Sequence, residues 1–192
     1  MTAQSTGRTD AHAIRIPYDV PLSEDAARDA ARQLETPIEA YDLIRPGGPT
    51  DTSQLESAVI ERVVDGDTFI IDWHGESTRL RLIGLDAPES FAHHDARKHT
   101  VEGESVSRVV KAWLTGRSIF LEFDPAGQTD PYDRLLAYVW LDDHTMVNEV
   151  LVREGLARER RYKPTVKWND YFEILEQKAQ HGWCGLWGRP PA

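Results

Sequence analysis

The chain has a single cysteine, Cys184, among its 192 residues. One cysteine excludes an internal disulfide framework and any cysteine-rich zinc site. No window approaches the roughly 18 apolar residues that a membrane span needs. The first residues, "MTAQSTGRTDAHAIRIP", lack the apolar core of a secretory signal. These absences lead us to expect a soluble cytoplasmic protein that has no membrane partner.

An excess of positive charge is also missing, because the formal net charge is −10. This balance argues against a protein coated in positive charge for general DNA packaging. It does not exclude a nucleic-acid substrate, since an enzyme needs only a local cationic site and a metal. Residues 1–57 hold 5 basic and 10 acidic side chains, so this segment is the more acidic part for its length.

The chain divides into an N-terminal extension, residues 1–57, and a domain, residues 58–192. Within the extension, "PLSEDAARDAARQLETP" predicts a helix that Ser23 can cap. Glycines and prolines then predict a flexible joint at about residues 45–53. The extension has few large apolar side chains, so we expect that it does not fold alone. Three arrangements are open for it: it packs on the domain, it packs on a protein partner, or it makes no packing contact.

Strand patterns begin at Ala58. The segments "AVIERVV", "TFIIDWH" and "STRLRLIG" alternate apolar and polar residues, which places Leu80 and Leu82 on one face and Arg79 and Arg81 on the other. A helix, two further strands and two helices follow. The order β-β-β-α-β-β-α-α predicts an α+β, mainly β fold, in which a five-stranded OB barrel carries three helices.

Three short segments carry chemistry. They are "DGD" at residues 65–67, "RLRLIGLDAPES" at 79–90 and "TDPYDRLLAYV" at 129–139. Taken singly, they fit a hairpin turn, a solvated edge strand and an exposed loop. A semi-buried arginine needs anionic partners, however, and paired carboxylates need a cation or a proton between them.

Together these segments resemble the staphylococcal nuclease family, the thermonuclease domain. The motifs "RVVDGDTF", "RLRLIGLDAPES", "DPYDRLLAYVWLDDHTMVNEVLVREGLA", "YKP" and "GLWG" occur in the family's order over roughly residues 58–188. The resemblance implies an OB barrel and the hydrolysis of phosphodiesters in single-stranded DNA and RNA, with calcium as the cofactor. Residues 1–57 have no counterpart in it.

The resemblance also implies the metal site. Asp67 and Asp86 match the family's metal carboxylates, and the backbone carbonyl of Ala87 matches a further ligand. Oxygen ligands of this kind suit calcium, whose shell can be completed by water and a phosphate oxygen. The family often has threonine where this chain has Ala87, a change that a backbone carbonyl ligand survives.

Carried over in the same way, Glu89 is the general base, and Arg81 and Arg134 hold the phosphate. Tyr132 and Tyr162 match tyrosines that shape the nucleotide pocket. A planar guanidinium offers paired donors to phosphate oxygens, which an ammonium group cannot reproduce.

One departure concerns Asp133, since the family usually has glycine before the second arginine. Its carboxylate can pair with Arg134 and weaken the hold on phosphate, or its backbone can strain a turn that glycine would relax.

Two clusters admit two interpretations each. "AHHDARKH", residues 92–99, contains ligand types for a transition metal, but we interpret it as a solvated loop beside the active site. "RERRYK", residues 158–163, is the densest basic cluster and is either a phosphate-tracking surface or a solvated helix end.

We therefore predict a calcium-dependent nuclease with low sequence specificity. The alternative is a non-catalytic OB-fold module that binds nucleic acid or protein. A third hypothesis is that residues 1–57 cover the site until a partner removes them.

Overall fold

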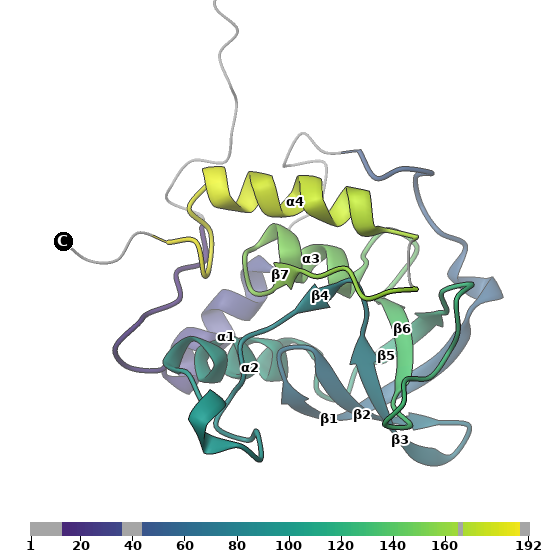
Figure 1. The fold of residues 1–192 in the computed structure, drawn as a ribbon, viewed down its shortest axis with the longest axis horizontal. Coiled ribbons are helices and arrows are strands. Elements are labelled where there is room, and N and C mark those ends of the chain that lie inside the picture. Colours follow the sequence, from purple (N-terminus) through teal and green to yellow (C-terminus); the bar gives the residue numbers. More distant parts are fainter. Residues whose placement is uncertain (1–12, 36–43, 165–166, 189–192) are drawn as a thin grey trace, which may run out of the picture.

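The computed structural model describes residues 13–35, 44–164 and 167–188. The predicted helix of the extension comes first, and the elements of the domain follow in the predicted order, with two short strands and two 3-10 helices inserted (Figure 1). Their bounds in chain order are α1 Glu24–Gln33, η3 Thr52–Gln54, β1 Glu56–Asp65, β2 Thr68–Trp73, β3 Glu76–Leu82, β4 Leu85–Asp86, η4 Ala96–Lys98, α2 Val101–Leu114, β5 Ser118–Glu122, β6 Leu135–Trp140, α3 Val147–Arg153, β7 Arg158–Glu159 and α4 Asn169–His181.

Five strands close into a barrel in the order β1-β2-β3-β6-β5. All neighbours are antiparallel except β3 and β6, which run parallel with Leu80 opposite Leu135 and Arg81 opposite Leu136. Leu80 and Leu82 are fully buried, while Arg79 and Arg81 lie on the other face of β3. The predicted OB barrel is therefore confirmed, and the alternation along β3 places the two arginines as expected.

Three helices accompany the barrel, also as predicted. Thr100 caps α2 by accepting a hydrogen bond from the backbone N–H of Gly103. Every residue of α3 is buried, and α4 packs along it on the side away from the barrel (Figure 1). Within the described ranges, none of the helices combines the length and the apolar character that crossing a bilayer requires.

The described part of the N-terminal extension packs on the domain. Helix α1 begins after Ser23, whose hydroxyl accepts a hydrogen bond from the N–H of Ala26 as predicted. The helix lies beside α2 (Figure 1), and its alanines Ala27, Ala30 and Ala31 are buried. Before α1, the backbone N–H of Gly185 donates to the carbonyl of Ile14 over 2.7 Å, and Ile14 is buried. Residues near the two ends of the chain are therefore joined.

The expected joint at residues 45–53 is anchored at both ends. Arg45 is 5% exposed, and its Nε lies 2.5 Å from Oε2 of Glu149 in α3. Its guanidinium also lies 4.7 Å from the ring centroid of Trp140. Further along, Asp143 accepts hydrogen bonds from both the N–H and the hydroxyl of Thr52. The segment therefore holds side chains of β6 and α3 together.

The buried Arg45–Glu149 pair yields a prediction about stability. We expect Arg45→Met to lower the free energy of unfolding by about 3 kcal/mol, because removing one partner leaves a buried charge less well compensated. Chemical denaturation measures this change. The matched control is Arg32→Met, which breaks an exposed pair with Asp29 and is expected to cost at most about 1 kcal/mol. Equal effects of the two substitutions would contradict the prediction.

Candidate active site

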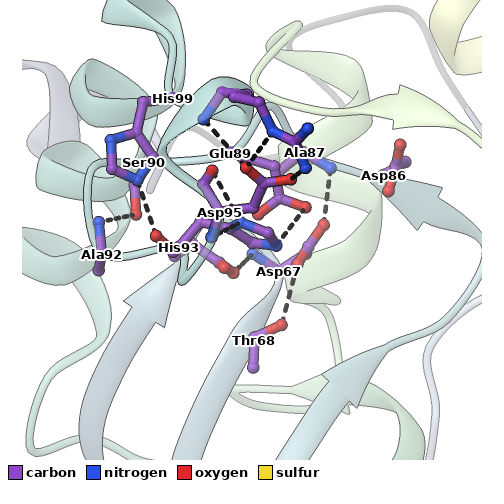
Figure 2. A network of polar contacts seen from close by, with 12 residues as sticks. Asp67, Thr68, Asp86, Ala87, Glu89, Ser90, Ala92, His93, Asp95 and His99 are labelled. Atoms are coloured by element: carbon purple, nitrogen blue, oxygen red, sulfur yellow. Dashed lines mark hydrogen bonds and ion pairs between the residues drawn. The ribbon is translucent and has the colours of Figure 1, made fainter.

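The turn between β1 and β2 places Asp67 inside the molecule. Its carboxylate is only 7% exposed and accepts hydrogen bonds from the N–H of Ala87 over 2.7 Å and from the hydroxyl of Thr68 over 3.1 Å (Figure 2). The preceding Gly66 has no room for a side chain, because a Cβ there would lie 2.7 Å from Cβ of Ala87. The hairpin expected at "DGD" thus also places a buried carboxylate beside Ala87, where the loop after β4 begins.

Arg81 joins the two predicted metal carboxylates. From the outer face of β3, its Nη1 lies 2.6 Å from Oδ2 of Asp67, and its Nη2 lies 2.9 Å from Oδ1 of Asp86. Arg81 is 11% exposed, whereas the side chain of Asp86 is 47% exposed. The guanidinium therefore spans from a buried carboxylate to one that faces solvent.

Tyr162 completes this cluster from the far end of the domain. Its hydroxyl donates to Oδ1 of Asp86 over 3.1 Å and accepts from Nη2 of Arg81 over 3.4 Å. Burial raises the pKa of Tyr162, so the hydroxyl keeps the proton that it donates. The short β4–β7 pairing, in which Asp86 lies opposite Arg158, brings this part of the chain to the site.

The buried position of Asp67 has an electrostatic consequence. Burial raises its pKa to about 8, although the Arg81 guanidinium and the Ala87 amide act in the opposite direction. The charged form of Asp67 is therefore costly here, and a cation close by would favour it.

The oxygen donors at this site fit a hard cation. Asp67, Asp86 and the carbonyl of Ala87 come from one turn and one short strand, and Asp86 is open to solvent. In the described ranges no group of three or more His, Cys, Asp or Glu side chains gathers to hold a metal. A bound ion would therefore need the carbonyl and water, which calcium accepts and a transition metal favours less.

Glu89 lies in the loop after β4 and is held through its backbone. Its carbonyl accepts a hydrogen bond from the N–H of Thr100 over 3.1 Å, and a Cβ on Gly103 of α2 would lie only 2.1 Å from that oxygen. The side chain is 35% exposed. The start of α2 therefore fixes where Glu89 lies.

His93, which the sequence analysis placed in a solvated loop beside the active site, points at Glu89 (Figure 2). Its Nδ1 accepts a hydrogen bond from the N–H of Asp95 over 3.0 Å, which leaves Nε2 on the side of Glu89. That nitrogen lies 3.7 Å from Oε1 of Glu89. The "AHHDARKH" segment thus supplies a neighbour to Glu89 instead of a metal cluster. Only the spacing of four residues between Glu89 and His93 could have hinted at it.

Arg134 and Tyr132 form a separate pair. Nε of Arg134 lies 2.7 Å from Oδ2 of Asp130, and its guanidinium lies 5.7 Å from the ring centroid of Tyr132, which is 81% exposed. Asp133 has a φ of 59°, a left-handed conformation that favours glycine. Of the two effects considered for Asp133, the structure shows the strained turn. The carboxylate that pairs with Arg134 is Asp130.

The register of the barrel relates Arg134 to Arg81. Leu136 lies opposite Arg81 in the parallel pair of β3 and β6, and Arg134 precedes Leu136 by two residues. Arg134 itself stands just before β6, so the two arginines belong to neighbouring parts of the barrel wall.

The basic cluster at residues 158–163 is largely engaged within the protein. Arg161 lies within 3.3 Å of carboxylate oxygens of Glu159, Asp170 and Glu173. Arg158 lies over the ring of Trp187, at 4.4 Å from its centroid. These contacts weaken the case for a phosphate-tracking surface at this point.

The fold and the site define a class: an OB-type barrel that carries Arg81 between two carboxylates, with a second arginine, Arg134, at the start of the neighbouring strand. The model of the family described as "Staphylococcal nuclease homologue" matches residues 79–189. The chain belongs to this family. The matched range includes Arg81, Glu89 and Arg134, while Asp67 precedes it.

Named relatives agree with this assignment. The thermonuclease of Staphylococcus intermedius is 40% identical over 153 residues, which cover 78% of this chain and 89% of the relative. The thermonuclease of Staphylococcus hyicus is 37% identical over 145 residues, covering 73% and 83%. Endonuclease YncB of Bacillus subtilis is 32% identical over 148 residues, covering 76% and 69%. The predicted family and the prediction of a nuclease are confirmed.

The buried Asp67 predicts a pH dependence of stability. Its pKa is raised from the ordinary 3.8 to about 8 in the folded state, so between these values the folded chain holds a proton that the unfolded chain has released. The free energy of unfolding of metal-free protein should then fall as pH rises from about 4 to about 8.

Asp67→Asn should lose this component of the slope, measured by denaturation at pH 5 and pH 8 in chelator. Asp170→Asn, at a carboxylate that is 93% exposed, is the matched control and should retain it. An Asp67→Asn variant with the wild-type slope would show that Asp67 titrates normally.

Proposed function

We propose that this chain is a calcium-dependent nuclease that hydrolyses phosphodiester bonds of single-stranded DNA and RNA with little sequence preference. The observation that carries the proposal is the position of Arg81 between Asp67 and Asp86, with Glu89 three residues further along the chain. One guanidinium thereby holds a carboxylate pair at the start of the loop that carries a third carboxylate, Glu89. Relatives named thermonuclease and endonuclease support the same chemistry.

In this proposal Asp67, Asp86 and the carbonyl of Ala87 hold the calcium ion. When bound, the ion supplies positive charge that polarises the phosphate and offsets the developing negative charge. The protein's part is to hold the two carboxylates in place. The hydrogen bond from Ala87 to Asp67 and that from Tyr162 to Asp86 orient them.

The side chains then divide the reaction between them. Glu89 takes a proton from the attacking water, a role for which its partly exposed carboxylate suits it. Arg81 donates hydrogen bonds to phosphate oxygens as charge builds in the transition state, and such fixed donors typically contribute about 2.7–4 kcal/mol. Arg134 lies at the start of the neighbouring strand, β6. It releases Asp130 and then binds the phosphate.

The two tyrosines are proposed to bind the nucleotide. Tyr132 is 81% exposed and lies beside Arg134, so its ring is free to stack on a base. Tyr162 contacts both Arg81 and Asp86, so its ring borders the place where the phosphate binds. Stacking on an aromatic ring accepts every base, which agrees with low sequence preference.

The alternative function, a non-catalytic binding module, is favoured by one contact. Asp130 engages Arg134 through the side-chain Nε and through the backbone N–H, and so competes with phosphate for this arginine. If the pair persists with substrate bound, the site holds nucleic acid without stabilising the transition state.

Cleavage of labelled oligonucleotides decides between the two functions. We expect purified wild-type protein to cut single-stranded DNA and RNA in calcium and to stop in chelator, with parallel reactions in magnesium. Glu89→Gln should lower the rate by roughly 10²–10⁴-fold, because it removes a positioned general base. Glu173→Gln, which changes a carboxylate on α4, is the matched control. Intact binding without cleavage in any metal would favour the module.

The packing of Gly103 predicts a second effect. Gly103→Ala places a methyl group against the Glu89 carbonyl, so the Glu89 backbone must shift. A displacement of about 1 Å at a catalytic group can lower activity by roughly 10²-fold. We expect kcat/KM to fall by that order while circular dichroism shows a folded protein. Gly182→Ala, where the nearest atoms lie at 3.3 Å, is the control. Full activity of folded Gly103→Ala would contradict the role given to this contact.

A further inference from the structure

A groove lies between the N-terminal helix and the domain, outside the carboxylate cluster. Its volume is about 580 Å³, within the roughly 300–1,000 Å³ of ligand sites. Helix α1 contributes one wall through Ala27 and Arg28, while α2 and β1 contribute Lys111 and Arg62. Figure 1 shows α1 lying alongside α2 at this place. The groove therefore exists only because the extension packs on the domain.

The groove borders the loop that carries the proposed general base, although Glu89 itself does not line it. Its lining includes Ser90 and Ala92, and Ser90 directly follows Glu89. In Figure 2, Ser90 and Ala92 lie on one side of Glu89 and Asp86 lies on the other. The groove therefore lies on the side of Glu89 that is opposite to Asp86.

The charge of the lining is positive, although the chain as a whole is at −10. The lining contains four cations, Arg28, Arg62, Arg108 and Lys111, and two carboxylates, which belong to Glu24 and Glu104. Two of these cations are already paired, since Arg28 contacts Glu24 and Arg108 contacts Glu104.

Two cations of the lining, Arg62 and Lys111, have no ion-pair partner among the residues that the structure describes. Both are exposed. Arg62 belongs to β1 and Lys111 to α2, so the charges come from two elements of the groove. Cations distributed along an open groove suit a chain of phosphates better than one small anion.

We propose that Arg62 and Lys111, in the groove closed by α1, bind the phosphodiester backbone of the single-stranded substrate beyond the scissile bond. The inference rests on the proposed nuclease function and deepens it, because it assigns the path of the substrate. It also gives the described part of the extension a role in binding: α1 forms a wall of the substrate path.

The test compares a long substrate with a short one. The double variant Arg62→Gln and Lys111→Gln is measured against wild type with a single-stranded 20-nucleotide DNA and with a dinucleotide, which is too short to reach the groove. The control is Arg32→Gln and Lys178→Gln, which removes the same charge at exposed positions on α1 and α4 outside the groove. Binding is followed by fluorescence anisotropy in chelator, and cleavage in calcium.

We expect the Kd for the 20-nucleotide strand to rise about tenfold in the groove variant. The kcat/KM for that strand should fall by about the same factor. The slope of log Kd against log salt should become shallower by about 1.4, because each lost phosphate contact removes about 0.7 for a single strand. Cleavage of the dinucleotide should stay within twofold of wild type, and so should both substrates with the control variant.

The outcomes separate this inference from the proposed function. Unchanged affinity and salt slope for the long strand would overturn the groove proposal, and so would an equal loss in the control variant. If wild type binds the strand through Arg62 and Lys111 but cuts neither substrate in calcium, the groove assignment stands and the proposed nuclease function fails.

Discussion

The site depends on one interaction, the guanidinium of Arg81 lying between Asp67 and Asp86. A buried carboxylate such as Asp67 is costly when charged, and so is a guanidinium that is only 11% exposed and has little water around it. Each group makes the position of the other favourable. Because Arg81 reaches a buried carboxylate on one side and an exposed one on the other, it connects the interior of the barrel to solvent at the point where a phosphate would arrive.

The backbone around this interaction leaves little freedom. The carbonyl of Asp67 accepts a hydrogen bond from the N–H of Leu82, and its carboxylate accepts one from the N–H of Ala87. Gly66 and Gly103 sit where no Cβ fits, against Ala87 and against the carbonyl of Glu89. The turn, the short strand and the start of α2 are therefore held by one another. Such fixed groups need little rearrangement when charge develops.

Local patterns predicted much of this structure. Alternation along "STRLRLIG" placed Arg81 outside the barrel, and Ser23 marked the start of α1, because both signals depend on nearby residues. The partner of Arg134 was harder to foresee, since Asp130 and Asp133 are both close in sequence and only the turn decides which carboxylate reaches it. The Arg45–Glu149 pair joins residues that are 104 positions apart, and no local sequence pattern around either residue indicates its partner.

These distant contacts give the N-terminal extension a structural role in addition to any regulatory one. A segment that only covered the active site could be removed without harm to the fold, and its loss would expose the catalytic groups. Here Ile14 and Leu34 are buried, and Arg45 is paired with Glu149 inside α3. Removing residues 1–53 would uncover apolar surface on α2 and leave Glu149 with fewer partners, so a change in activity would mix stability with regulation. Substitutions that keep α1 in place and alter only the groove therefore address the function of this segment more directly than its deletion.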